Sequence, residues 1–144
     1  MYKLLVNVFL CFLISNTSMV NATNLEPPDK IATQVQAVVR AQLKAFAADD
    51  AKAAYLLAAD EIQQMFGSAN QFMQMVRNTY PVVYRPSAVM FYKPESRDDA
   101  VVQRVAMTDS QGVAWVAVYR LELRKNKAWR IAGCVLIPDT SQKA

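Results

Sequence analysis

The chain has 144 residues, of which 16 are basic, 12 are acidic and none is histidine, so its formal net charge is +4. This mildly basic balance comes without a dense run of lysine or arginine, so no nucleic-acid partner is expected. The lack of histidine excludes catalysis by a histidine–carboxylate pair and any histidine-based metal site.

The first 22 residues have the pattern of a secretory signal peptide. Lys3 supplies a positive charge, residues 4–14 are apolar apart from Asn7, and Val20-Asn21-Ala22 fits the small-residue pattern before a cleavage site. The apolar run is shorter than the roughly 20 residues of a stable membrane span. We therefore expect cleavage after Ala22 and a periplasmic or secreted protein with no stable membrane span; an uncleaved N-terminal anchor is the alternative.

Residues 23–28 read as a linker, residues 29–140 as a single domain and residues 141–144 as a tail. The first half of the domain has the apolar spacing and the capping residues of helices. The first expected helix runs from a cap at Asp29 to a break at Asp49-Asp50, and its apolar stripe is formed by Ile31, Val35, Val38, Val39, Leu43 and Phe46. The second covers residues 51–58 and is capped by Asp50. The third covers residues 61–66, between a cap at Asp60 and an end at Gly67, and the fourth covers residues 69–79, capped by Ser68.

The second half of the domain has the alternating pattern of an antiparallel sheet. Pro81 and Pro86 bracket residues 82–85, which we expect to be an extended crossing segment. The expected strands are residues 87–92, 101–108, 113–123 and 128–137, with an exposed loop at residues 95–99 and a hairpin turn at residues 109–112. Helices followed by strands predict an α+β fold, with the N-terminal helices packed on a curved antiparallel sheet of about four strands.

Residues 113–123 show two different faces. One face is apolar from Val113 to Leu123, so we expect it to be buried against the helices along its whole length. The other face is apolar near the turn at residues 109–112 and charged beyond it. An apolar half-face on the outside of a sheet needs a cover, so we expect a homodimer through this outer face.

Sulfur-containing residues favour a structural role. Without residues 1–22 the chain keeps one cysteine, Cys134, which excludes an internal disulfide and reads as a small buried hydrophobe in its strand. Met65 and Met73 are expected to fill the core, and Met75 to be partly exposed. No residue pattern predicts a metal site, a phosphate-binding loop or any cofactor.

Several sequence blocks resemble known families. Residues 45–51 (AFAADDA) and the closing Trp129-Arg130-Ile131 are similar to the NTF2-like superfamily, whose domains are cystatin-like cones with a long first helix held in a curved sheet. Residues 39–46, 62–67, 80–86, 115–120 and 129–138 more narrowly resemble DUF4864, a bacterial family of unknown function. The superfamily resemblance implies a cone that can hold a ligand, and some of its members are lyases or isomerases.

The expected ligand-binding residues are five aromatic residues and one arginine. Tyr80, Tyr84 and Arg85 lie in the proline-framed segment, where their polar ends could line the mouth of a cone and contact a small apolar or anionic ligand. Trp115 and Tyr119 occupy inward positions of their strand, and Tyr55 lies near Asp60. The alternative is structural: the two tyrosines pack over the open end and Arg85 pairs with an acid.

We identify no catalytic residue, because the acidic side chains fall at helix caps, in loops or on the outward strand face. Asp60 and Glu61 are the least unsuitable candidates for an acid inside the cone. We therefore expect an exported, non-enzymatic domain that binds a small ligand or a protein partner. The alternative is an isomerase or lyase of the carboxylate–tyrosine, ketosteroid-isomerase-like type, which requires a carboxylate pointing into a cavity.

Overall fold

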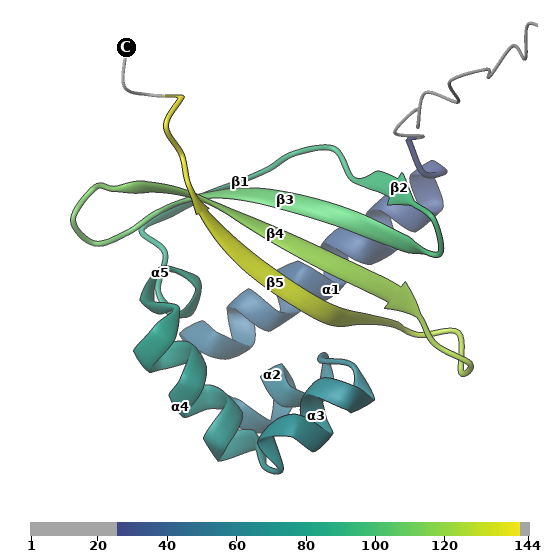
Figure 1. Ribbon diagram of the computed structural model, residues 1–144, viewed down its shortest axis with the longest axis horizontal. Helices are drawn as coiled ribbons and strands as arrows, with labels where there is room; N and C mark the ends of the chain where they lie inside the picture. Colours follow the sequence, from purple (N-terminus) through teal and green to yellow (C-terminus); the bar gives the residue numbers. More distant parts are fainter. Residues whose placement is uncertain (1–25, 142–144) are drawn as a thin grey trace, which may run out of the picture.

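Helices form the first half of the described chain and strands the second in the computed structural model, which describes residues 26–141 (Figure 1). The helices are α1 (Asp29–Ala47), α2 (Ala51–Leu56), α3 (Asp60–Phe66), α4 (Ala69–Thr79) and α5 (Pro81–Tyr84). The strands are β1 (Ala88–Phe91), β2 (Glu95–Arg97), β3 (Ala100–Thr108), β4 (Ala114–Leu123) and β5 (Trp129–Pro138). The predicted α+β class is confirmed; the predicted signal peptide lies outside the described residues.

Three of the predicted helix signals act as expected. The Asp50 carboxylate accepts a hydrogen bond from Ala53 N at 3.0 Å and caps α2. The Ser68 hydroxyl accepts from Gln71 N at 3.2 Å and caps α4. Gly67 ends α3 in the left-handed conformation, with φ at 73°.

The predicted caps at Asp29 and Asp60 are wrong by one residue. Each is the first residue of its helix, behind Pro28 and Ala59, which offer no side-chain cap. The backbone explains the shift, since Pro28 O already accepts from Ala32 N at 3.0 Å. Both carboxylates still lie in the first helical turn, where they interact favourably with the helix dipole.

All strand pairs of the sheet are antiparallel. Its main order is β1-β3-β4-β5, and β2 pairs with the other end of the β3 edge along which β1 lies. The sheet thus has five strands where about four were predicted, because Glu95–Arg97 was expected to be loop. The short strand is held by backbone pairing and by Glu95, which pairs with Arg104 of β3 at 2.8 Å.

The prediction that residues 82–85 are extended is wrong. Residues Pro81–Tyr84 form α5, and Val82 and Val83 are buried. Proline fits the first turn of a helix, because a backbone N–H at that position would have no partner within the helix and its absence therefore costs nothing. Pro86 restricts only the residue before it, and Arg85 is indeed the residue at which the helix has ended.

The core lies between α1 and the inner face of the sheet. Figure 1 shows α1 running along this face, with α2, α3 and α4 closing the space at one end. Val35, Val39 and Phe46 of α1 are fully buried, as are Tyr119 and Leu121 of β4. The expected burial of residues 113–123 along their whole length is wrong at the ends, since Val113 is 46% and Leu123 is 52% exposed. The strand extends beyond the helices that cover its middle.

The outer sheet face has the predicted apolar and charged halves. Near the β3–β4 turn, Met90, Ala106, Val116 and Ile137 lie side by side on four neighbouring strands. The charged half includes Arg120 and Glu122, which pair with each other, and Arg104. In Figure 1 all five helices of residues 26–141 lie on the opposite side of the sheet.

Candidate ligand-binding cavity

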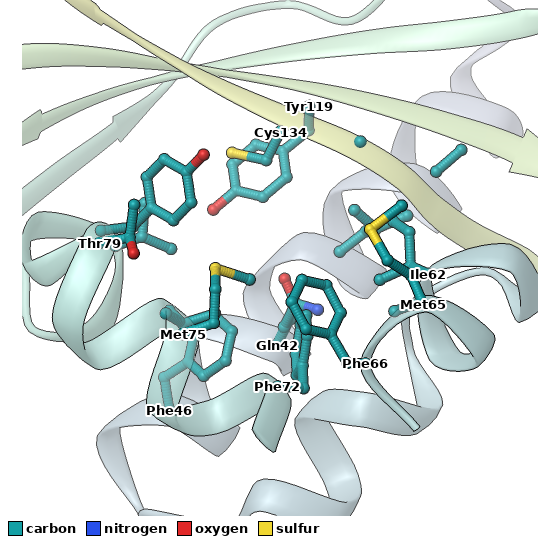
Figure 2. A pocket seen from close by; sticks show the side chains of 17 residues that line it. Gln42, Phe46, Ile62, Met65, Phe66, Phe72, Met75, Thr79, Tyr119 and Cys134 are labelled. Atoms are coloured by element: carbon teal, nitrogen blue, oxygen red, sulfur yellow. The ribbon is translucent and has the colours of Figure 1, made fainter. Parts of the chain in front are cut away.

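A cavity of about 450 Å³ lies between the inner sheet face and α1, α3 and α4 (Figure 2). This volume falls within the usual range of small-molecule sites, about 300–1,000 Å³. Its lining residues are Gln42, Phe46, Ala58, Ile62, Met65, Phe66, Phe72, Met75, Val76, Thr79, Tyr80, Val83, Tyr119, Ile131, Ala132, Gly133 and Cys134. The cone is therefore not completely filled by its own side chains.

Aromatic rings form one wall of the cavity. Phe72 of α4 lies at the centre of this cluster, with its ring centroid 6.1 Å from that of Phe46 and 5.7 Å from that of Phe66. Tyr55 supports the cluster from behind, with its ring 5.9 Å from Phe72. Its hydroxyl donates to Gln63 O at 2.5 Å and so ties α2 to α3. Rings held by α1, α3 and α4 make a rigid apolar surface for a ligand.

Met65 corrects one prediction about the core. Its side chain is 76% exposed, although it was expected to fill the core, and it lines the cavity. Met73 is buried as predicted, and Met75 is half-buried and lines the cavity. Because most of its side chain is exposed, Met65 lies at the open edge of the cavity and not in the filled core.

A β-bulge shapes the β5 wall. Arg120 pairs with Gly133 and Leu121 pairs with Ile131, which leaves Ala132 as the extra residue. The backbone of Ile131 also bonds the α2–α3 connection, donating to Leu57 O at 2.9 Å and accepting from Ala59 N at 2.8 Å. These bonds hold α3 against the sheet beside the cavity.

Only a few polar groups face the cavity. Gln42 is 4% exposed, and its Nε2 donates to Ala54 O at 3.1 Å. Tyr119 is 1% exposed, and its hydroxyl has no hydrogen-bond partner among the described residues. In Figure 2, Tyr119 and Cys134 enter from the sheet side and Gln42 lies across from them among the phenylalanines.

Burial keeps two of these groups protonated. Loss of solvation raises the pKa of the Cys134 thiol to about 12. Burial, together with the neighbouring Cys134, raises the pKa of the Tyr119 hydroxyl well above its usual value of 10. Both groups are therefore neutral at physiological pH, when each can donate a hydrogen bond.

No aspartate, glutamate, lysine or arginine is among the residues that line this cavity. Glu61, one of the two candidate acids, instead pairs with Arg124 at 2.5 Å, which lowers the pKa of its carboxyl group. The carboxylate that a ketosteroid-isomerase-like reaction would need is thus not in the lining. Within residues 26–141, no group of three or more Cys, Asp or Glu side chains is placed to hold a metal ion.

The structure brings together two of the six predicted ligand-binding residues. Tyr80 and Tyr119 both line the cavity, from the end of α4 and from β4. Tyr55 lies behind the lining, as described above. Trp115 is also outside the lining; its Nε1 donates to the Asp109 carboxylate at 3.1 Å near the β3–β4 turn.

Tyr84 and Arg85, the remaining two, belong to a surface cluster around Asp49. The Asp49 carboxylate accepts from the Tyr84 hydroxyl and from Arg85 at 2.9 Å, and pairs with Arg77 at 3.3 Å. Arg85 also donates to Ala47 O at 2.6 Å, at the end of α1. These contacts, with the Tyr84 hydrogen bond as the largest, lower the pKa of Asp49. The contacts are those of a brace between α1, α4 and α5.

Most of the cavity lining was not predicted from the sequence. Gln42 carried a usable signal, because it interrupts the apolar stripe of α1 between Val39 and Phe46. Ile62, Phe66 and other apolar lining residues carried none, because an apolar residue facing a cavity has the same sequence pattern as one in a filled core.

The fold and the cavity define a class: an α+β domain in which helices and a curved sheet enclose a small apolar space. The model of the family described as a domain of unknown function, DUF4864, matches residues 28–144, so the chain belongs to this family, as its sequence blocks predicted.

Comparison with solved structures finds an NTF-2-like protein of unknown function from Burkholderia xenovorans LB400. Its crystal structure has a TM-score of 0.43 and 14% sequence identity to this chain, over 77% of this chain and 92% of that one. No curated protein matches the chain. Among the described residues, no helix is both long and apolar enough to cross a membrane.

Proposed function

We propose that this protein is an exported, non-enzymatic domain that binds a small, largely apolar molecule in the cavity between α1, α3, α4 and the sheet. The observation that carries the proposal is the lining itself, which encloses about 450 Å³ with mainly aromatic and aliphatic side chains and no charged residue. Apolar sites with a few placed polar groups are the usual form of a small-molecule site. The same lining offers no carboxylate to act as a base, so we do not favour the isomerase or lyase alternative.

Binding can be tested with N-phenyl-1-naphthylamine, an uncharged dye whose fluorescence increases in apolar surroundings. We expect the wild-type protein to bind the dye and to melt at a higher temperature in its presence. Met75→Trp fills the cavity and should weaken binding at least tenfold. Met90→Trp, the same substitution on the outer sheet face where Met90 is 56% exposed, should leave binding unchanged.

Thr79→Phe serves as a second filling variant if Met75→Trp does not fold. A wild-type protein that shows neither fluorescence enhancement nor a thermal shift would overturn the proposal, as would equal binding by the filled and control variants.

Export to the periplasm or the medium rests on the signal-peptide pattern of residues 1–22. Fractionation of bacteria that express the full chain should place the protein outside the cytoplasm, and N-terminal sequencing should begin at Thr23. Recovery of the intact chain in the cytoplasm would contradict this part of the proposal.

A second copy of the chain is the partner that we propose for the outer sheet face. The apolar half presents Met90, Val135 and Ile137, which are 56%, 62% and 50% exposed. The charged half carries both signs, in Arg120 and Glu122, so the face can pair with its own copy about a two-fold axis. This interface would lie on the opposite side of the sheet from the cavity.

A further inference from the structure

The Tyr119 hydroxyl is an unpaired polar group beside an apolar cavity. Tyr119 lies on the inner face of the central strand β4, between Gln103 of β3 and Cys134 of β5. Its side chain is 1% exposed, and its hydroxyl finds no hydrogen-bond partner among the described residues. Figure 2 shows it projecting from the sheet toward the helices that form the other side of the cavity.

The neighbours of Tyr119 do not use its proton. The Gln103 amide donates through its Nε2 to Tyr92 O at 2.8 Å and to Arg104 O at 2.7 Å, while its buried Oε1 makes no hydrogen bond, to Tyr119 or to any other described residue. The Cys134 thiol is close enough to the Tyr119 hydroxyl for each group to shift the pKa of the other, but a protonated thiol is only a weak acceptor and leaves the hydroxyl without a strong partner. The phenolic O–H is therefore available as a donor on the cavity side.

An unpaired buried hydroxyl costs free energy that a phenylalanine would avoid. Departures from such rules of folding are expected where a residue serves a function. The position therefore points to a ligand that supplies the missing acceptor.

The cavity also restricts the charge of that ligand. A carboxylate or phosphate beside Tyr119 would lie among Phe72, Met75 and Val76 with no lysine or arginine in the lining to pair with it. Burying an unpaired charge is far more costly than burying a carbonyl or hydroxyl oxygen that receives a hydrogen bond.

We propose that the cavity binds an uncharged molecule whose oxygen acceptor, such as a ketone or hydroxyl oxygen, receives a hydrogen bond from Tyr119 while its apolar body packs on Phe66, Phe72 and Met75. This inference rests on the proposed function, because it specifies the ligand of the same cavity. It selects the neutral class from the two ligand classes, apolar and anionic, that the sequence left open.

Three probes of similar size separate the effect of a hydrogen-bond acceptor on binding from the effect of a charge. 4-Acetylbiphenyl carries a ketone, 4-ethylbiphenyl lacks the acceptor, and biphenyl-4-carboxylate carries a charge. Their dissociation constants can be measured with the full chain by displacement of N-phenyl-1-naphthylamine. We expect the ketone to bind about tenfold more tightly than the ethyl compound, the gain of one hydrogen bond to a buried group. The carboxylate should bind at least tenfold more weakly than the ketone.

Tyr119→Phe should reduce the preference for the ketone to within about twofold and leave 4-ethylbiphenyl binding unchanged. Tyr92→Phe, which removes a hydroxyl outside the lining, should keep the preference. The comparison of the probes on wild-type protein stands even if Tyr119→Phe does not fold.

Equal binding of the ketone and ethyl compounds would overturn this inference while leaving the proposed function intact. So would a preference that survives Tyr119→Phe, one that is lost in Tyr92→Phe, or tightest binding of the carboxylate. If the wild-type protein binds neither the dye nor any biphenyl, the proposed function itself fails and this inference with it.

Discussion

Tyr119 and Cys134 are cross-strand neighbours whose environment is unusual for their residue types. Both are ionisable, and burial raises the pKa of each. Neither makes a charged contact, so both add polar chemistry to an otherwise apolar cavity. Their contributions to stability can be measured separately. That of Tyr119 is tested by removing its unpaired hydroxyl, and that of Cys134 by changing the pH.

Tyr119→Phe should stabilise the ligand-free protein. Removing a buried hydroxyl that has no partner removes a desolvation penalty of about 1–3 kcal/mol, so we expect the free energy of unfolding in urea to rise or at least not to fall. Tyr55→Phe is the matched control, because the Tyr55 hydroxyl donates to Gln63 O at 2.5 Å, and its loss should cost about 1 kcal/mol. A loss of stability in Tyr119→Phe as large as in Tyr55→Phe would show that the Tyr119 hydroxyl has a partner.

Stability should fall above about pH 9. The Cys134 pKa is about 12 in the folded protein against an ordinary value of 9.0, so the unfolded chain loses this proton first and is favoured as the pH rises between these values. The expected slope from this group is up to about 1.4 kcal/mol per pH unit. Tyr119 acts in the same direction above pH 10.

Urea unfolding at pH 8, 9 and 10 measures this effect, with Cys134→Ala as the comparison. The variant should lose less stability than the wild type between about pH 9 and pH 10. Identical pH dependence in the two proteins would contradict the prediction.

At the scale of elements, the β3–β4 hairpin shows how local chemistry sets a turn. The Asp109 carboxylate accepts from Val113 N and Gln111 N, both at 2.9 Å. The bond from Val113 lowers its pKa the most, followed by the hydrogen bond from Trp115. Gly112 completes the turn with φ at 81°, in the left-handed region that favours glycine. The turn at residues 109–112 was predicted from these residue types.

Gly112→Ala should destabilise the protein by about 1 kcal/mol through the backbone alone. A Cβ at this position would meet no atom within 4 Å, so packing does not contribute. Gly133→Ala is the matched control, because a Cβ there is equally free of contacts and its φ is not in the left-handed region. It should leave stability unchanged or slightly raised. Equal thermal midpoints for the two variants would contradict this explanation.

Two other elements show where local patterns did not suffice. The prolines around α5 are compatible with both an extended segment and a short helix. The helix is the conformation in which Val82 and Val83 are buried, and this burial stabilises it. Glu95–Arg97 has no apolar alternation, and it forms β2 only because β3 offers a free edge. Both outcomes depend on contacts with parts of the chain that are distant in sequence.

At the scale of the whole molecule, the sheet separates two surfaces with different chemistry. The inner face closes the cavity, and the outer face presents an apolar half that none of the described helices covers. Binding of a ligand and association with a second copy would therefore not compete.

The proposed dimer is tested by sedimentation velocity across a concentration series. The wild-type protein should dimerise, and Val135→Glu, which places a charge in the apolar half of the outer face, should shift it to monomer. Leu56→Glu is the matched control, since Leu56 is 50% exposed on α2, on the helical side. A wild-type protein that stays monomeric, or a control that dissociates equally, would contradict the interface.

The sequence by itself determined the α+β class, the family and most element boundaries, because spacing, caps and turn residues act over a few residues. It also placed Tyr119 at an inward strand position and Tyr80 near the mouth of the expected cone. Only the tertiary structure decided that the cone keeps a cavity. It also decided that Tyr84 and Arg85 brace α1 and do not line this cavity. A cavity is a volume that side chains from α1, α3, α4, β4 and β5 fail to fill, and no local pattern records what is left unfilled. The unpaired Tyr119 hydroxyl likewise has meaning only once its surroundings are known.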